Sequence, residues 1–170
     1  ETATGAGNST TFNDSEGVLM MEASTLKKNG SFENITLSSG TTAYVVLIFY
    51  RPTENEVNFR VTVNNVLQMD KVYHLDDVTL FNKMLIKYKQ NDFSVYVNGY
   101  KIHSDDNGIT FASGTLDRIN FDSSIGTDDF YGNVKQLQYF DSALADTQLE
   151  QLTSWQSFRD MANGQLYTIE

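Results

Sequence analysis

Residues 81–102 read FNKMLIKYKQNDFSVYVNGYKI, and the stretch holds two strand-like runs followed by the start of a third. Residues 90–92 (QND) separate the first run, KMLIKYK, from the second, FSVYV, and Asn98-Gly99 separates FSVYV from YKIH. Asparagine, aspartate and glycine accept the positive φ angles that tight hairpin turns require. The stretch therefore predicts a meander of three antiparallel strands.

Short β-rich runs of the same kind recur along most of the chain. The further runs, with Gly, Asn or Asp between them, are GVLMMEA, FENITLS, AYVVLIFY, EVNFRVTV, VLQMD, LDRINFD and NVKQLQYF. In EVNFRVTV, residues 56–63, apolar and polar residues alternate, which places one face on a core and the other in solvent. No helical segment separates the runs, so we expect antiparallel pairing and an all-β sandwich.

The alternation stops after the last of these runs and gives way to helical spacing. Three leucines recur at approximately one helical turn within residues 144–152, and Asp146 stands where a carboxylate favours a helix N-terminus. We therefore expect a short helix over residues 146–153 that caps the sandwich. A second helical turn over residues 157–163 extends the predicted helical segment to residues 146–163.

The beginning of the chain differs in composition from the rest. Residues 1–16 are small and polar, so they are interpreted as a linker, with ordered structure from Gly17 onward. Residues 17–170 then form one domain, which suits a chain of 170 residues. Because the first residue is Glu and not Met, we expect the sequence to be a piece of a longer protein.

The composition argues against several classes of function. The chain has no cysteine, which removes disulfides, thiolate catalysis and cysteine-based zinc sites. A formal net charge of −10 opposes binding to nucleic acid or anionic membranes, since phosphate contact needs clusters of Lys and Arg. The longest apolar run, residues 43–50, is too short to insert across a membrane and predicts a buried strand.

The sequence also lacks the patterns expected of an enzyme. A glycosidase on a sandwich would need two facing carboxylates, whereas the adjacent pairs Asp76-Asp77 and Asp105-Asp106 point to opposite sides of an extended chain. Both pairs sit beside turn residues, which is the simpler explanation of them. The two histidines stand apart from any nucleophile motif. We therefore expect a non-catalytic domain.

Two stretches resemble laminin-G-like domains. Residues 81–102 look like the central hairpin of that family, whose second strand ends in Tyr-Val-Asn/Asp-Gly. In residues 130–153, an aromatic-x-Gly, a Val-x-x-Leu-x-x-aromatic strand and an Ala-Leu-x-Asp-x-x-Leu segment follow one another, as in the closing part of the family. The resemblance implies a concanavalin A-like jelly roll of two curved antiparallel sheets.

Three further motifs resemble laminin-G-like modules in virion proteins of tailed phages, particularly tail fibres. They are EGVL-x-x-E from Glu16, DFYG from Asp129 and LTSW-x-SF-x-x-MA from Leu152. The resemblance implies an adhesion or structural module on a virion surface, or otherwise extracellular, that binds a cell-surface glycan or host receptor or holds other fibre subunits. It also implies a homotrimer. The alternative is a carbohydrate-binding module of a secreted bacterial enzyme or adhesin.

Residues 120–132, NFDSSIGTDDFYG, place Asp122, Asp128 and Asp129 around a loop that contains glycine. Carboxylate oxygens on such a loop suit calcium, and the resemblance to laminin-G and pentraxin domains implies calcium on rim loops. The ligand spacing matches no fixed calcium motif, so turn formation is the alternative role. The three aspartates are the candidate metal ligands, although we expect no cofactor to be required.

The candidate ligand-binding residues lie on predicted loops at strand ends. Tyr100 follows the second turn of the meander, and Asp105, Asp106 and Asn107 follow the next strand. An aromatic face can stack on a sugar ring while carboxylates and amides bind its hydroxyls. If these strand ends share one edge of the sandwich, the residues form one binding rim together with the loop of the three aspartates.

Overall fold

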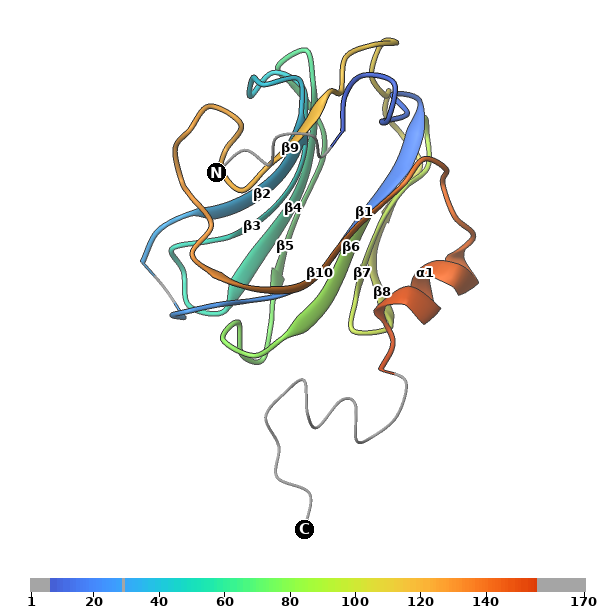
Figure 1. Ribbon diagram of the computed structural model, residues 1–170. Helices are drawn as coiled ribbons and strands as arrows, with labels where there is room; N and C mark the ends of the chain where they lie inside the picture. The colour runs from blue at the N-terminus through green and yellow to red at the C-terminus, as the bar shows by residue number, and fades with distance from the viewer. Residues whose placement is uncertain (1–6, 29, 156–170) are drawn as a thin grey trace.

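The computed structural model describes residues 7–28 and 30–155 of the chain (Figure 1). Within them, two five-stranded antiparallel sheets face each other. The front sheet has the order β5 (Val66–His74), β4 (Glu56–Val63), β3 (Val45–Tyr50), β2 (Glu33–Ser38) and β9 (Arg118–Asn120). The back sheet has the order β10 (Gly132–Phe140), β1 (Glu16–Thr25), β6 (Asn82–Lys89), β7 (Phe93–Val97) and β8 (Tyr100–Asp105). The predicted all-β jelly-roll sandwich is confirmed.

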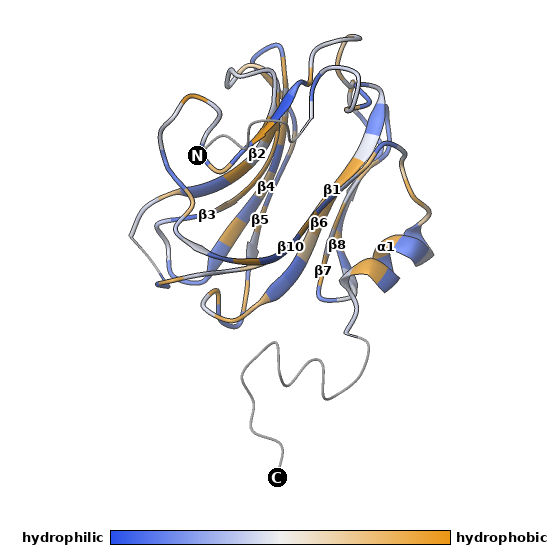
Figure 2. Cartoon of the chain, viewed as in Figure 1, coloured by the Kyte–Doolittle hydropathy of each residue, from blue (hydrophilic) through white to orange (hydrophobic). Residues whose placement is uncertain are grey.

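The hydrophobic core lies between the two sheets. Apolar and polar residues alternate along several strands, as the colours along β4 illustrate in Figure 2. The inward-facing side chains include the fully buried Phe59, Tyr88 and Phe93. Each large side chain removed from water in this way stabilises the fold by about 1.5–3 kcal/mol.

The meander predicted for residues 81–102 consists of β6, β7 and β8. Asn91 has a φ of 56° in the first turn, and Asn98 and Gly99 have φ values of 48° and 89° in the second. The Asn98 side chain also fixes the second turn, because its Oδ1 accepts the Lys83 N–H at 2.9 Å. The turn residues therefore adopt the positive φ angles for which the sequence selects them.

The alternation of β4 is correct for its inner face, and on its outer face it fails at one residue. The apolar residues of β4 point into the core as predicted. On the outer face, however, Asn58 is only 2% exposed. Asn58 lies between Phe49 of β3 and Val72 of β5, its partners in the sheet, and these neighbours shield its side chain from solvent.

The helix α1 (Asp146–Thr153) has the bounds predicted from the leucine spacing. Leu149 is fully buried and packs on the outer face of the back sheet against Val18, Met20, Leu85 and Tyr96. At the N-terminus, the Asp146 carboxylate accepts a hydrogen bond from the Lys101 ammonium, and this bond lowers the pKa of the Asp146 carboxyl below its usual value. Packing and charge thus both hold α1 on the sheet.

The interpretation of residues 1–16 as a linker is wrong for residues 8–15. Phe12 is 5% exposed, and its ring contacts the ring of Tyr139 edge-on with 5.0 Å between centroids. The Asn13 backbone N–H donates to the Tyr139 hydroxyl at 2.7 Å, and the Tyr88 hydroxyl donates to the Asn13 carbonyl at 2.7 Å. This polar segment therefore contributes to the core, and ordered structure begins before Gly17.

Asp14 links residues 8–15 to the connection between β8 and β9 through side-chain hydrogen bonds. Its Oδ2 accepts the Gly114 N–H at 2.6 Å, and its Oδ1 accepts the Leu116 N–H at 2.8 Å. Asp14 and Leu116 are both buried. The carboxylate thus satisfies two backbone donors that the irregular β8–β9 connection would otherwise leave without partners.

The second helical turn predicted for residues 157–163 lies outside the described residues. In the part of the chain that is described, no helix has the length and apolarity needed to cross a membrane.

Candidate ligand-binding site

The outer face of the front sheet carries a groove of about 400 Å³. Strands β3, β4 and β5 form its floor, and Ser123 and Asp128 from the β9–β10 connection line its side. Figure 1 shows this connection, residues 121–131, on the side of the front sheet that faces away from the back sheet and α1. We call this feature the front groove.

Hydrogen bonds hold the 121–131 connection against β2. The backbone N–H and the side-chain amide of Asn34 both donate to the Asp128 carbonyl, at 3.2 and 3.1 Å. The Thr36 hydroxyl donates to the Asp122 carbonyl at 2.6 Å. Asn34 and Thr36 are buried beneath the connection. The wall of the front groove is therefore fixed relative to its floor.

Asp70 of β5 organises the centre of the front groove. Its Oδ1 accepts hydrogen bonds from Asn58 Nδ2 at 2.6 Å and from Arg60 Nε at 2.9 Å. The Arg60 guanidinium also lies over the ring of Phe49, with 5.4 Å between Cζ and the ring centroid. These contacts hold the guanidinium in one orientation, and its terminal nitrogens carry further N–H donors for a bound molecule.

A second cation and an aromatic pair line one end of the front groove. The Arg51 Nη1 lies 2.8 Å from Glu56 Oε2, which holds this guanidinium beside the floor. Phe32 is 41% exposed, and its ring centroid lies 5.8 Å from that of Phe49. The groove thus combines guanidinium, amide and carboxylate groups with an aromatic surface, an arrangement that can bind a polar molecule with one apolar face.

A buried carboxyl group lies next to the 121–131 connection. Glu33 is 3% exposed, and its Oε2 has no hydrogen-bond partner among the described residues. Burial raises the pKa of the Glu33 carboxyl, although the Lys27 charge and a hydrogen bond from the Tyr131 backbone oppose the shift. The negative charge of Glu33 is therefore disfavoured in the folded state.

The residues predicted to bind a ligand are not brought together. Tyr100, which is 75% exposed, begins β8, whereas Asp105 ends it. A strand of this length spans about 17 Å. Asp106 and Asn107 lie beyond Asp105, where the Asn107 N–H donates to Asp105 Oδ1 at 3.0 Å. The condition that these strand ends share one edge is not met, and the front groove is lined by other residues.

The three predicted metal ligands occupy different environments in their loop. Asp122 is buried, and its Oδ1 accepts the Ser124 N–H at 2.6 Å, which is a turn contact. Asp128 has a φ of 56° and lines the front groove, while Asp129 is exposed. Across residues 7–28 and 30–155, no three His, Cys, Asp or Glu side chains lie close enough together to hold a metal ion. Calcium binding by this loop stays a prediction.

Sequence reasoning missed the residues on the floor of the front groove. Asn58 and Arg60 occupy outward positions in the alternating run EVNFRVTV, and such positions were assigned to solvent. The available signal was their chemistry, since an amide and a guanidinium stand two residues apart on one face at the middle of a long strand. Their contact with Asp70 depends on strand register and could not be read from that run alone.

No protein-family model and no curated protein matches the chain. Solved structures do match it in fold. CBM40 of the Ruminococcus gnavus IT-sialidase bound to α2,3-sialyllactose has a TM-score of 0.66, 14% identity, and coverage of 84% of each chain.

Two other similar structures are a second sialidase and a pentraxin. The leech intramolecular trans-sialidase has a TM-score of 0.65 and 13% identity, and the match covers 86% of this chain and 24% of the leech chain. The heptameric SAP-like pentraxin of Limulus polyphemus has a TM-score of 0.62 and 14% identity, and the match covers 85% of this chain and 72% of the pentraxin chain. At these identities, the likeness establishes a shared fold.

Proposed function

We propose that the chain is a non-catalytic carbohydrate-binding module and that the front groove binds the glycan. The observation that carries this proposal is the pair of hydrogen bonds by which Asp70 orients Asn58 and Arg60 beside the ring of Phe49. A sugar presents hydroxyl groups at its edge and C–H groups on its face, which match the polar centre and the aromatic end of this groove.

The two guanidinium groups favour a glycan that carries an acidic sugar. Guanidinium binds a carboxylate through paired, charge-assisted hydrogen bonds, and Arg51 and Arg60 both line the groove. The fold shared with a module bound to α2,3-sialyllactose supports the same ligand class. The ion pairs with Glu56 and Asp70 hold the two guanidinium groups in place before a ligand binds. Binding therefore costs less side-chain conformational entropy.

The setting that fits this function is extracellular, with the module attached to a secreted enzyme or adhesin. Two of the similar structures come from sialidases, and the leech chain is about four times as long as the matched part. The alternative is a receptor-binding part of a phage fibre, on which the chain would assemble as a homotrimer. Light scattering on the full-length protein separates these settings, since a trimer favours the fibre.

The decisive experiment compares 3′-sialyllactose with lactose by isothermal titration calorimetry. We expect binding of the acidic glycan, and Arg60→Ala should weaken it by about 10–100-fold, the value of one charged hydrogen bond of about 1.5–3 kcal/mol. Arg118→Ala is the matched control, because Arg118 also pairs with an aspartate but lies on β9, away from the lining of the groove. Equal affinity of both variants for 3′-sialyllactose would contradict the proposed site.

A second measurement addresses catalysis. Incubation with a panel of polysaccharides and sialosides should release neither reducing sugar nor sialic acid. Turnover that is lost in Asp70→Asn would overturn the non-catalytic assignment.

A further inference from the structure

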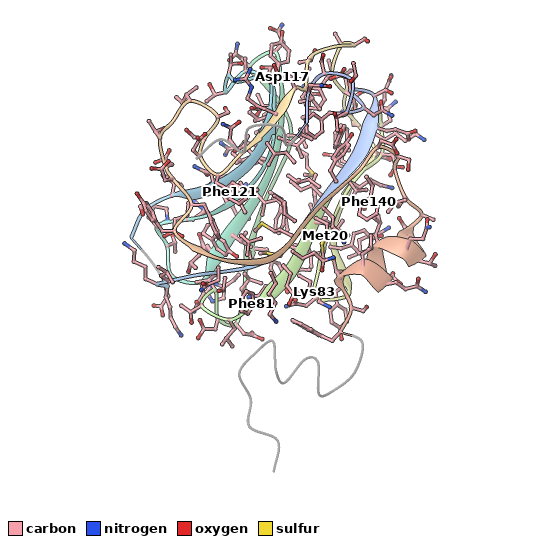
Figure 3. All side chains as sticks on the ribbon, in the orientation of Figure 1. Met20, Phe81, Lys83, Asp117, Phe121 and Phe140 are labelled. Carbon is pink, nitrogen blue, oxygen red and sulfur yellow. The ribbon has the colours of Figure 1, made fainter. Side chains whose placement is uncertain are left out.

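A second groove, of about 500 Å³, lies between α1 and the outer face of the back sheet. Figure 3 shows Phe140, Met20 and Lys83 on the strands beside α1, and of these three Phe140 and Lys83 line the groove. Because α1 covers the back sheet, this groove and the front groove lie on opposite faces of the sandwich. We call it the back groove.

Incomplete cover by α1 creates the apolar part of the back groove. Leu149 anchors the helix and is fully buried, whereas Phe140, Leu144 and Leu152 pack beside it and stay partly buried. All three of these partly buried residues line the back groove. They supply a small apolar surface between the helix and the edge strand β10.

Side-chain amides supply most of the polar lining. Gln136 of β10 faces Gln148 and Gln151 of α1 across the back groove. The Gln148 Oε1 accepts the Ala145 N–H at 3.0 Å, which fixes that amide at the rim. Gln138 lies between Gln136 and Phe140 in the same outward row of β10, opposite Met20. Its Oε1 is buried without a hydrogen-bond partner among the described residues, and Gln138 lies beneath the lining and is not part of it.

The cation in the lining is Lys83, and its ammonium group already contacts other residues of the chain. The Lys83 Nζ donates to the Ser154 carbonyl at 3.1 Å and lies 4.6 Å from the centroid of the Trp155 ring. Lys83 is also buried. Among the described residues the lining contains no carboxylate, so the back groove offers amides and apolar groups in place of the paired guanidinium groups of the front groove.

We propose that the back groove is a second binding site and that its ligand is an uncharged oligosaccharide. Amides donate to and accept from hydroxyl groups, while the ring of Phe140 and the two leucines contact the C–H face of a sugar. An extended peptide that adds a strand would instead pair along the free edge of β10. The back groove lies over a sheet face, where side-chain amides provide the polar contacts.

Two sites on opposite faces give the module two binding valences. Each site can engage a separate glycan chain, so binding to a surface that presents both ligands becomes stronger without any new contact. The acidic and the neutral ligand would not compete with each other, because the two grooves share none of the lining residues that the structure describes.

The test is a titration of isotope-labelled protein followed by the NMR shifts of its backbone amides. The probes are maltohexaose, cellohexaose and N-acetylchitohexaose, each at millimolar concentration. We expect at least one probe to shift the amides of α1 and β10 and not those of the front groove. Gln136→Ala and Gln151→Ala should each weaken this binding at least about tenfold, while Gln90→Ala, in the exposed β6–β7 turn, leaves it unchanged.

The outcomes separate this proposal from the function of the front groove. Arg60→Ala should retain the α1 and β10 shifts even if it abolishes binding of 3′-sialyllactose. The back groove proposal is overturned if none of the three probes shifts α1 and β10, or if the shifts persist unchanged in both glutamine variants. It is also overturned if a mixed-sequence peptide library shifts these residues and the three oligosaccharides do not.

Discussion

Replacement of Asp14 by alanine is expected to destabilise the domain by about 3 kcal/mol. The carboxylate accepts hydrogen bonds from the backbone N–H groups of Leu116 and Gly114. The buried Leu116 N–H would lose its partner without gaining water, which costs about 1.5–3 kcal/mol for a bond to a charged group. Gly114 is exposed, so its N–H can turn to solvent and adds a smaller loss of about 0.5–1.5 kcal/mol.

Urea denaturation of Asp14→Ala measures this loss directly. The midpoint should fall with the slope unchanged, and the melting temperature should fall by about 6–12 °C, at about 2–4 °C per kcal/mol for a domain of this size. Asp106→Ala, at an exposed position eight residues before Gly114, is the control and should unfold like the unaltered protein. If Asp14→Ala and Asp106→Ala unfold at the same urea concentration, residues 8–15 are a dispensable linker after all.

Three further perturbations follow from individual contacts. Glu33→Gln removes a carboxyl whose folded-state pKa is raised, so the variant should be more stable than the unaltered protein at pH 7.5. This advantage should shrink as the pH falls towards 4.5, because the Glu33 carboxyl of the unaltered protein then becomes protonated. Urea midpoints that differ equally at both pH values would refute this. Gly132→Ala places a Cβ 2.1 Å from the Ser24 carbonyl oxygen and should cost at least about 3 kcal/mol in thermal unfolding, whereas Gly126→Ala meets no atom within 4 Å and should cost only about 1–2 kcal/mol for its positive φ. If the loop of Asp122, Asp128 and Asp129 binds calcium, a calcium concentration about a hundred times the dissociation constant should add about 2.7 kcal/mol to the free energy of unfolding. A melting temperature that does not change with calcium, or that rises equally in Asp128→Ala, would contradict calcium binding by this loop.

The strands and the helix could be predicted because their signals are local. The alternation in residues 56–63 gives β4 its bounds, and the leucine spacing gives α1 the bounds 146–153. Each of these patterns is complete within a short stretch, since side chains two or three to four residues apart share a face. Long-range strand pairing then only has to bring together the apolar faces that these local patterns already define.

The role of residues 8–15 could not be predicted, because its evidence is spread over distant parts of the chain. The segment holds a single large apolar residue, Phe12, among small polar ones. Asp14 meets a partner 102 residues away, and Asn13 meets one 126 residues away. Neither partner forms a pattern with its aspartate or asparagine, so the polar composition alone favoured a linker.

The centre of the front groove depends on a register that turn chemistry sets only in part. Asn64 and Asn65 have φ values of 51° and 63°, and their two-residue turn pairs Val63 with Val66. Continued regularly, that register would set Arg60 opposite Met69 and turn Asp70 towards the core. A register shift between Val61 and Thr62 instead pairs Arg60 with Asp70.

The shift follows from burial and not from the turn. A register slip of one residue moves every later side chain of a strand to the other face. With the shift, Met69 is 2% exposed in the core, whereas the regular register would bury the Asp70 carboxylate among apolar side chains. Burying an unpaired carboxylate costs far more than one unpaired residue in a bulge, so the core selects the shifted register. The same choice that buries Met69 therefore delivers Asp70 to Asn58 and Arg60, and the polar centre of the front groove is a consequence of how the core is packed.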